Sequence, residues 1–315
     1  MRRSSPSAAI RRLVVPLDGS RLAERVLPAV ARLARGLKAS VTLLHVLERR
    51  APARVHGERH LTDRADAEAY LAGVARAWLH RGIRTTWHVH DDDTGGLPRV
   101  LAAHELEFGP DLVVLCTHGR GGGRRALLGS VAQRLVDAGS VPVLVLRPPW
   151  SRATVGASFR SILFALDPLA GHGGSALGTA AELARVLGAV VHLVAIVPAY
   201  GLRLGRWAVT GRLLPSATAE MLDQSVEDAG RLLRRRSAAL ARSGIRADTL
   251  VLRGDPVRAL VRAAADLDAD LVALSTHGRS GARTLFTGSV ASRVAALCPR
   301  PLLLAPEPRP RRRDT

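Results

Sequence analysis

The stretch "CTHGRGGGRRALLGSV" (residues 116–131) follows a short apolar run and occurs a second time, as "STHGRSGARTLFTGSV" (residues 275–290). In both copies, nine residues separate the glycine of the THGR corner from a Gly-Ser pair. An aspartate and four apolar residues ("DLVVL" and "DLVAL") precede the two copies, and a short apolar run next to prolines follows each of them. A segment that recurs with its spacing intact indicates an internal repeat, which defines the folding unit of the chain.

The repeat extends over most of the 315 residues. The segment "RRLVVPLDGS" (residues 11–20) has a counterpart in "RSILFALDPLA" (residues 160–170), and each is an apolar run that ends in an aspartate. A chain of this length fits two domains of about 150 residues. We therefore predict a first domain at residues 1–150, a linker at 151–157, a second domain at 158–308 and a basic tail at 309–315.

Within each copy, short apolar runs alternate with helical patterns, which is typical of β-α-β units around a parallel sheet. The predicted fold class is α/β, with two tandem doubly wound, Rossmann-like domains that each hold a five-stranded, parallel-type sheet. In the first copy we expect strands near residues 13–17, 41–46, 84–89, 112–116 and 143–146, with helices at 21–37, 66–81, 97–107 and 131–138. In the second copy we expect helices at 174–187, 219–243, 256–266 and 290–297.

The composition is that of a globular protein with a high positive charge. The formal net charge is +19, which alone suggests a polyanionic partner, but 45 of the 46 basic residues are arginine and they are spread along the whole chain. This pattern favours a general preference for arginine over a specific nucleic-acid surface. The two cysteines form no disulfide framework, and no apolar run reaches the about 18 residues of a membrane span. We expect a cytoplasmic protein without a membrane partner.

The glycine-rich corner has the chemistry of a phosphate site. Unblocked backbone N–H groups and the N-terminus of a helix both suit an anion, and the Ser130 hydroxyl either caps that helix or binds a phosphate oxygen. The known fingerprints do not fit, because no lysine completes a Walker A loop and Arg124 stands where the last glycine of a dinucleotide motif belongs. The residues therefore disfavour an ordinary NTPase or dehydrogenase.

The repeated corner, together with an aspartate at the end of each first strand, resembles the universal stress protein (UspA-like) family. The resemblance covers nearly the whole chain, in two copies. It implies two domains of the adenine nucleotide alpha hydrolase-like type that bind ATP, alone or with Mg²⁺. Cys116 and Ser275 replace the first glycine of the family's G-x-x-G, nine residues, G-[ST] pattern, and Ala165 replaces a proline.

The resemblance also implies the residues that contact the nucleotide. In the first copy these nucleotide-binding positions are Pro16, Leu17, Asp18, Val46, Gly119, Gly129, Ser130 and Val131. In the second copy they are Ala165, Leu166, Asp167, Ile196, Gly278, Gly288, Ser289 and Val290. The first copy keeps the family's residue types more closely than the second.

By the same resemblance, we expect a sensor or regulator of the stress response rather than a fast enzyme, with no catalytic residues. We also expect the two domains to form an intrachain pseudo-dimer, with a homodimer as a further possibility. Two alternatives remain open. One is a nucleotide-free member of the family that acts as a protein-interaction module, and the other is an arginine-rich stress protein associated with nucleic acid.

Other reactive residues favour structural roles. His88 and His90 lie on one face of a predicted strand, and three aspartates follow them in the sequence. The second copy has no such group, so we expect no metal site. The corner histidines His118 and His277 lack a partner arrangement for nucleophilic catalysis. Cys116 is expected to pack at a strand end.

Overall fold

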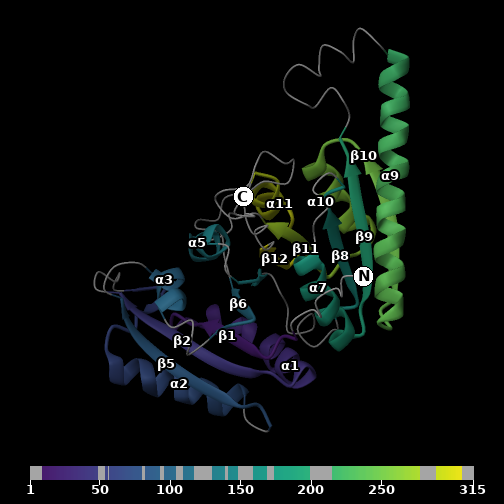
Figure 1. Cartoon of the computed structure of the whole chain (residues 1–315). Helices are drawn as coiled ribbons and strands as arrows, with labels where there is room; N and C mark the ends of the chain where they lie inside the picture. Colours follow the sequence, from purple (N-terminus) through teal and green to yellow (C-terminus); the bar gives the residue numbers. More distant parts are fainter. Residues whose placement is uncertain are drawn as a thin grey trace, which may run out of the picture. The chain divides into compact units, whose positions relative to one another are not determined.

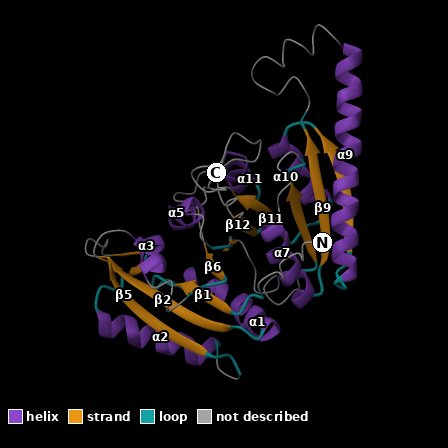
Figure 2. Ribbon diagram, viewed as in Figure 1, coloured by secondary structure: helices purple, strands orange, loops and turns teal. Residues whose placement is uncertain are grey.

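The computed structural model describes residues 9–48, 54–55, 57–79, 82–92, 96–103, 109–116, 130–138, 141–147, 159–168, 174–198, 215–276 and 289–306. The chain divides into two compact units, the first formed by residues 1–158 with 301–305 and the second by residues 159–300 with 306–315. Each unit is an α/β structure around a mostly parallel sheet (Figures 1 and 2). The predicted fold class is thereby confirmed.

The first unit has the strand order β5-β2-β1-β6-β7-β12. Its strands are β1 (Arg12–Pro16), β2 (Ser40–Glu48), β5 (Thr85–Asp92), β6 (Leu112–Cys116), β7 (Val143–Leu146) and β12 (Leu302–Pro306). All pair in parallel except β12, which runs antiparallel to β7 with Leu303 opposite Leu144. This pairing is the reason why residues 301–305 belong to the first unit. A short hairpin, β3 (Arg54–Val55) and β4 (Glu58–Arg59), stands apart from the sheet.

Helices cover the first sheet on both faces (Figure 1). Helix α1 contacts α2, and α3 contacts α5. Their bounds are α1 (Leu27–Leu37), α2 (Arg64–Trp78), α3 (Gly96–Ala103) and α5 (Ser130–Ala138). A 3₁₀ turn, η1 (Ala23–Val26), precedes α1, so the α-helix begins six residues later than the predicted residue 21. Pro28 explains the late start, because proline fits only the first turn of an α-helix.

The second unit repeats this plan with the strand order β10-β9-β8-β11, all parallel. Its strands are β8 (Ser161–Leu166), β9 (Val190–Val197), β10 (Ala247–Arg253) and β11 (Leu271–Thr276). Its helices are α7 (Gly174–Leu187), α9 (Pro215–Arg242), α10 (Pro256–Asp266) and α11 (Ser289–Leu297). Helix α9 packs on β9 and β10 and begins four residues before the predicted start, whereas the other helices match the sequence pattern closely.

A carboxylate joins the first and fourth strands in both units. Asp111 Oδ2 accepts hydrogen bonds from the backbone amides of Arg11 and Arg12, at 2.8 and 2.9 Å. Asp270 Oδ2 does the same for Arg160 and Ser161, at 2.7 and 3.1 Å. The aspartate thereby satisfies two amides at the start of the strand and fixes where the two strands begin.

The turn that leads from the first helix into the second strand also recurs. In the first unit Lys38 ends α1 in the left-handed conformation, with φ 53°, and in the second unit Gly188 does so after α7, with φ +69°. In each case the next residue's amide bonds back to the helix, from Ala39 to Ala34 and from Ala189 to Ala184, both at 2.9 Å. The conformation is therefore required by the fold and not by the residue type.

We predict that Gly188→Ala lowers the free energy of unfolding by about 1 kcal/mol, because a side chain disfavours positive φ. No atom lies within 4 Å of the added Cβ, so backbone conformation is the only cost. The matched control is Gly73→Ala in the interior of α2, where the added Cβ is equally unobstructed. That change should raise stability by up to about 1 kcal/mol. Urea denaturation measures both, and two shifts of the same sign would contradict this account.

The described helices include none that is both long enough and apolar enough to cross a membrane.

Candidate functional site

The structure brings the described residues of the first predicted site to the carboxyl edge of the first sheet. Pro16 ends β1 and leads into Leu17 and Asp18, while Val46 lies on the neighbouring strand β2. Val131 lies in the first turn of α5 and is 43% exposed. Ser130 is the first residue of α5, and Gly119 and Gly129 lie outside the described residues. Ligands of open parallel sheets bind at this edge.

The residues of the second copy take the same positions in the second sheet. Ala165 and Leu166 end β8, Asp167 follows, and Ile196 lies on β9. Val290 lies in the first turn of α11, which begins at Ser289. The predicted glycines Gly278 and Gly288 lie outside the described residues.

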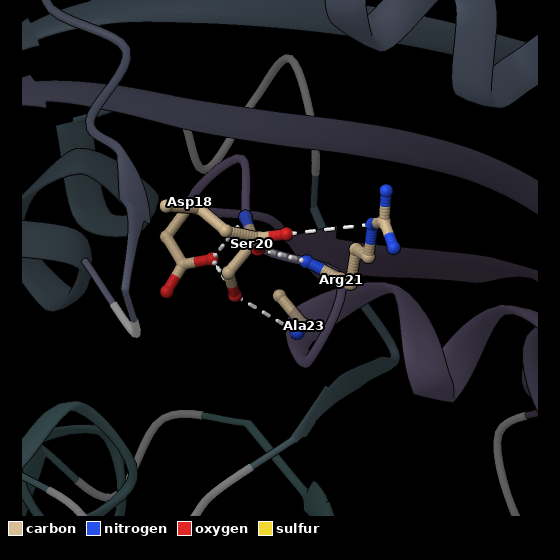
Figure 3. A network of polar contacts seen from close by, with 5 residues as sticks. Asp18, Ser20, Arg21 and Ala23 are labelled. Carbon is tan, nitrogen blue, oxygen red and sulfur yellow. Dashed lines mark hydrogen bonds and ion pairs between the residues drawn. The ribbon is translucent and has the colours of Figure 1, made fainter. Parts of the chain in front are cut away.

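The Asp18 carboxylate is held in place by Ser20 (Figure 3). Asp18 Oδ1 accepts hydrogen bonds from the Ser20 amide at 3.0 Å and from the Ser20 hydroxyl at 2.6 Å. Ser20 Oγ in turn accepts from the amide of Ala23, at 3.1 Å, where η1 begins. Ser20 is fully buried. The sequence analysis did not select Ser20, although a serine two residues after an aspartate is a known turn signal.

The strand end that carries Asp18 is anchored by a buried histidine. His45 is 1% exposed, and its Nδ1 lies 2.7 Å from the carbonyl oxygen of Leu17 while its Nε2 lies 3.1 Å from that of Leu61. Both partners are acceptors, so the neutral ring donates to one of them and the imidazolium donates to both. His45 thereby ties the end of β1 to the segment that enters α2. Ala195 occupies the matching position of the second copy, so this anchor exists in the first repeat alone.

The turn after Asp18 depends on Gly19. Its φ is +85°, and a Cβ at this position would lie 2.9 Å from two atoms of the Leu61 side chain. The backbone beside the carboxylate therefore packs directly on the segment that His45 holds.

The wall of the site near Asp18 is acidic. The phenol of Tyr70 has its pKa raised, first by burial and then by the negative charge of Glu24, with smaller effects of Asp18 and Glu58. Glu58 also accepts a hydrogen bond from the Arg21 amide at 2.7 Å. The negative charges of Asp18 and Glu24 therefore act on a phenol that stays protonated, whereas Glu58 is ion-paired with Arg21, whose Nε lies 3.5 Å from its Oε1. This end of the site suits hydrogen-bond donors.

Cys116 lies at the same edge, at the end of β6. Burial raises the pKa of its thiol to about 11, with Arg25 acting to lower it and Asp18 to raise it further. The parallel register of β1 and β6, with Val14 opposite Val113, brings the residues after β1 and the end of β6 to the same edge of the sheet. A protonated, half-buried thiol agrees with a packing role.

The histidines on β5 lie next to each other, and Asp93, the last of the three aspartates that follow them, lies outside the described residues. The rings of His88 and His90 have centroids 6.0 Å apart, but no group of three His, Cys, Asp or Glu residues suited to a metal exists in the part of the chain that the structure describes. The corner histidines His118 and His277 lie outside those residues.

Comparison with known proteins identifies the family. The model of the universal stress protein family matches residues 9–147 and again residues 158–306. A curated relative from Thermus aquaticus, described as a universal stress protein in the QAH/OAS sulfhydrylase 3' region, is 34% identical over 150 residues, covering 46% of this chain and 98% of its own. The chain therefore belongs to the universal stress protein family and carries two copies of its domain.

Solved structures show the same fold over the whole chain. A protein of unknown function from Pseudomonas aeruginosa PAO1 has a TM-score of 0.66 at 19% identity and covers 96% of this chain, which in turn covers 95% of that protein. A universal stress protein from Archaeoglobus fulgidus has a TM-score of 0.60 at 17% identity, with coverages of 94% and 96%. At these identities the likeness concerns the fold alone.

We predict that His45→Ala lowers the free energy of unfolding by about 3 kcal/mol, because it removes the ring that bridges two carbonyl oxygens and leaves a cavity. The control is His192→Ala on β9, whose ring lies 3.5 Å from the exposed carboxylate of Asp248. That surface pair should contribute less than about 1 kcal/mol. Urea denaturation gives both values, and equal losses would show that the two carbonyl contacts of His45 add nothing.

We predict slow alkylation of Cys116 in the native protein, because its pKa of about 11 leaves roughly 0.1% thiolate at pH 8. The rate should rise about tenfold per pH unit until the pH approaches 11. Cys298 is 1% exposed and should not react while the chain is folded. Mass spectrometry after iodoacetamide treatment measures both sites, and a rate that levels off near pH 8 would contradict the raised pKa.

Proposed function

We propose that the chain binds ATP at the carboxyl edge of the first repeat and acts in the cytoplasm as a sensor or regulator of the stress response. The observation that carries this proposal is the oriented carboxylate of Asp18. Its Oδ1 already accepts two hydrogen bonds from Ser20, so its position is fixed before a ligand arrives. A preorganised acceptor of this kind suits the amino or hydroxyl donors of an adenine nucleoside.

The two ends of the site have opposite electrostatic character, which also supports the proposal. At one end Asp18 and Glu24 supply negative charge near Tyr70, whereas Glu58 is ion-paired with Arg21. The N-terminus of α5 follows the glycine-rich corner, and its backbone amides and dipole favour an anion. A nucleotide carries hydrogen-bond donors at its base and sugar and negative charge at its phosphates, so it matches both ends.

A binding role without rapid turnover fits the residues at this edge. The aspartate at the site is engaged by Ser20, and the thiol of Cys116 stays protonated because its pKa is raised to about 11. Hydrolysis at a useful rate requires a base placed to activate water. We therefore propose that the occupied and empty forms of the protein carry the signal.

The first test is the release and rebinding of nucleotide. We expect ATP in the supernatant after the purified protein is denatured. For the emptied protein, Mg-ATP at about 100 times its dissociation constant should stabilise the fold by about 2.7 kcal/mol. If no ATP is released and Mg-ATP does not shift the melting temperature, the proposal is overturned and a nucleotide-free interaction module is favoured.

The variant Asp18→Asn should weaken ATP binding about tenfold or more, because a neutral amide replaces an ionised acceptor. Asp223→Asn in α9 is the control, since Asp223 is exposed and ion-paired with Arg253 at 2.6 Å. Isothermal titration calorimetry measures both affinities. An unchanged affinity of Asp18→Asn would place the nucleotide elsewhere.

A further inference from the structure

The two copies of the predicted site differ in their exposure to solvent. In the first copy Pro16, Asp18 and Val46 are partly exposed, and in the second copy their counterparts Ala165, Asp167 and Ile196 are 2%, 3% and 0% exposed. The same contrast holds at the helix that follows the glycine-rich corner. Val131 on α5 is 43% exposed, whereas Val290 at the same place on α11 is 6% exposed.

The contrast does not extend to every matched position at this edge. Leu17 and Leu166, which point into their domains, are both buried, at 3% and 1% exposure. Cys116 and Ser275, at the end of the fourth strands, are half-exposed in both copies. The second unit is therefore not more buried throughout. It is covered at the base-contacting and helix positions.

The sequence around the two aspartates differs in a way that matches their exposure. In the first copy Gly19 and Ser20 follow Asp18, and Ser20 supplies an amide and a hydroxyl that orient its carboxylate. In the second copy Pro168 and Leu169 follow Asp167, so the hydroxyl is absent. Oδ2 of Asp167 lies buried in the protein interior. The Asp167 side chain, 3% exposed, is therefore out of reach of a ligand in solution.

Resting on the proposed function, we infer that the second repeat is closed to nucleotide and that the chain binds one ATP, in the first repeat. Four matched positions are covered in one copy and open in the other. A bound nucleotide buries most of its surface in a preformed pocket, so its contact residues must be accessible in the free protein. Only the first repeat meets this condition at the described positions.

The first experiment needs no nucleotide. In a Cys116→Ser background, Val131→Cys and Val290→Cys are treated with N-ethylmaleimide and followed by mass spectrometry. We expect modification of Val131→Cys to be at least tenfold faster in the native state, with equal rates in urea. Equal native rates would overturn the closure of the second repeat.

A second pair guards against a variant that fails to fold. Pro16→Cys and Ala165→Cys probe the ends of β1 and β8. Because Ala165→Cys makes the side chain larger and Val290→Cys makes it smaller, the two variants of the second repeat disturb packing in opposite ways. Circular dichroism and the melting temperature verify folding before labelling. The expected order is again faster modification in the first repeat, and the reverse order would contradict the inference.

The second experiment counts the nucleotide. Equilibrium dialysis with Mg-ATP up to about 100 times its dissociation constant should saturate at one ATP per chain. Asp18→Asn should shift the whole binding curve. Saturation at two ATP per chain would overturn the single site while leaving the proposed function intact. The same holds if Asp18→Asn shifts only half of the binding curve. A wild-type chain that binds no ATP would overturn the proposed function, and the labelling experiment would still decide whether the second repeat is closed.

Discussion

The carboxylate that precedes the fourth strand fixes the geometry of each sheet. Asp111 accepts from the first two amides around the start of β1, and Asp270 does so at the start of β8. Strands have a nearly constant rise per residue, so a register set at one edge of a parallel sheet also determines which residues meet at the other edge. Leu13 pairs with Leu112, and four residues further along each strand come Leu17 and Cys116. The position of Asp18 beside Cys116 therefore follows from a contact at the opposite edge of the sheet.

Much of this architecture could be predicted from the sequence because buried parallel strands are short continuous apolar runs, and the repeat displays each of them twice. The start of α1 was missed by six residues, since local pattern does not report where a 3₁₀ turn ends and an α-helix begins. The start of α9 was missed by four residues. The hairpin of β3 and β4 has only two residues in each strand and carries no periodic signal. The glycines Gly119, Gly129, Gly278 and Gly288 remain predictions, because they lie outside the described residues.

The site was predicted less completely than the fold, and the reason is physical. Residue type identifies Asp18 and Asp167 as equivalent, yet one is half-exposed and the other is 3% exposed. Exposure depends on what packs against a residue from distant parts of the chain. His45 was missed for the same reason, because its two carbonyl partners, Leu17 and Leu61, become visible only when β2 lies beside β1 and the chain returns to α2. Sequence reveals the chemistry that a position can supply, and packing decides whether a ligand can use it.

The antiparallel partner of β7 has a consequence for how the protein is made. Strand β12 belongs to the first unit, although its residues 302–306 leave the ribosome more than 150 residues after β7. Until they emerge, the outer edge of β7, whose side chains Val143 to Leu146 end up almost completely buried, has no strand beside it. An unpaired apolar strand edge can pair with the wrong strand or aggregate during synthesis. The first half of the chain thus completes its sheet only when the second half has been translated.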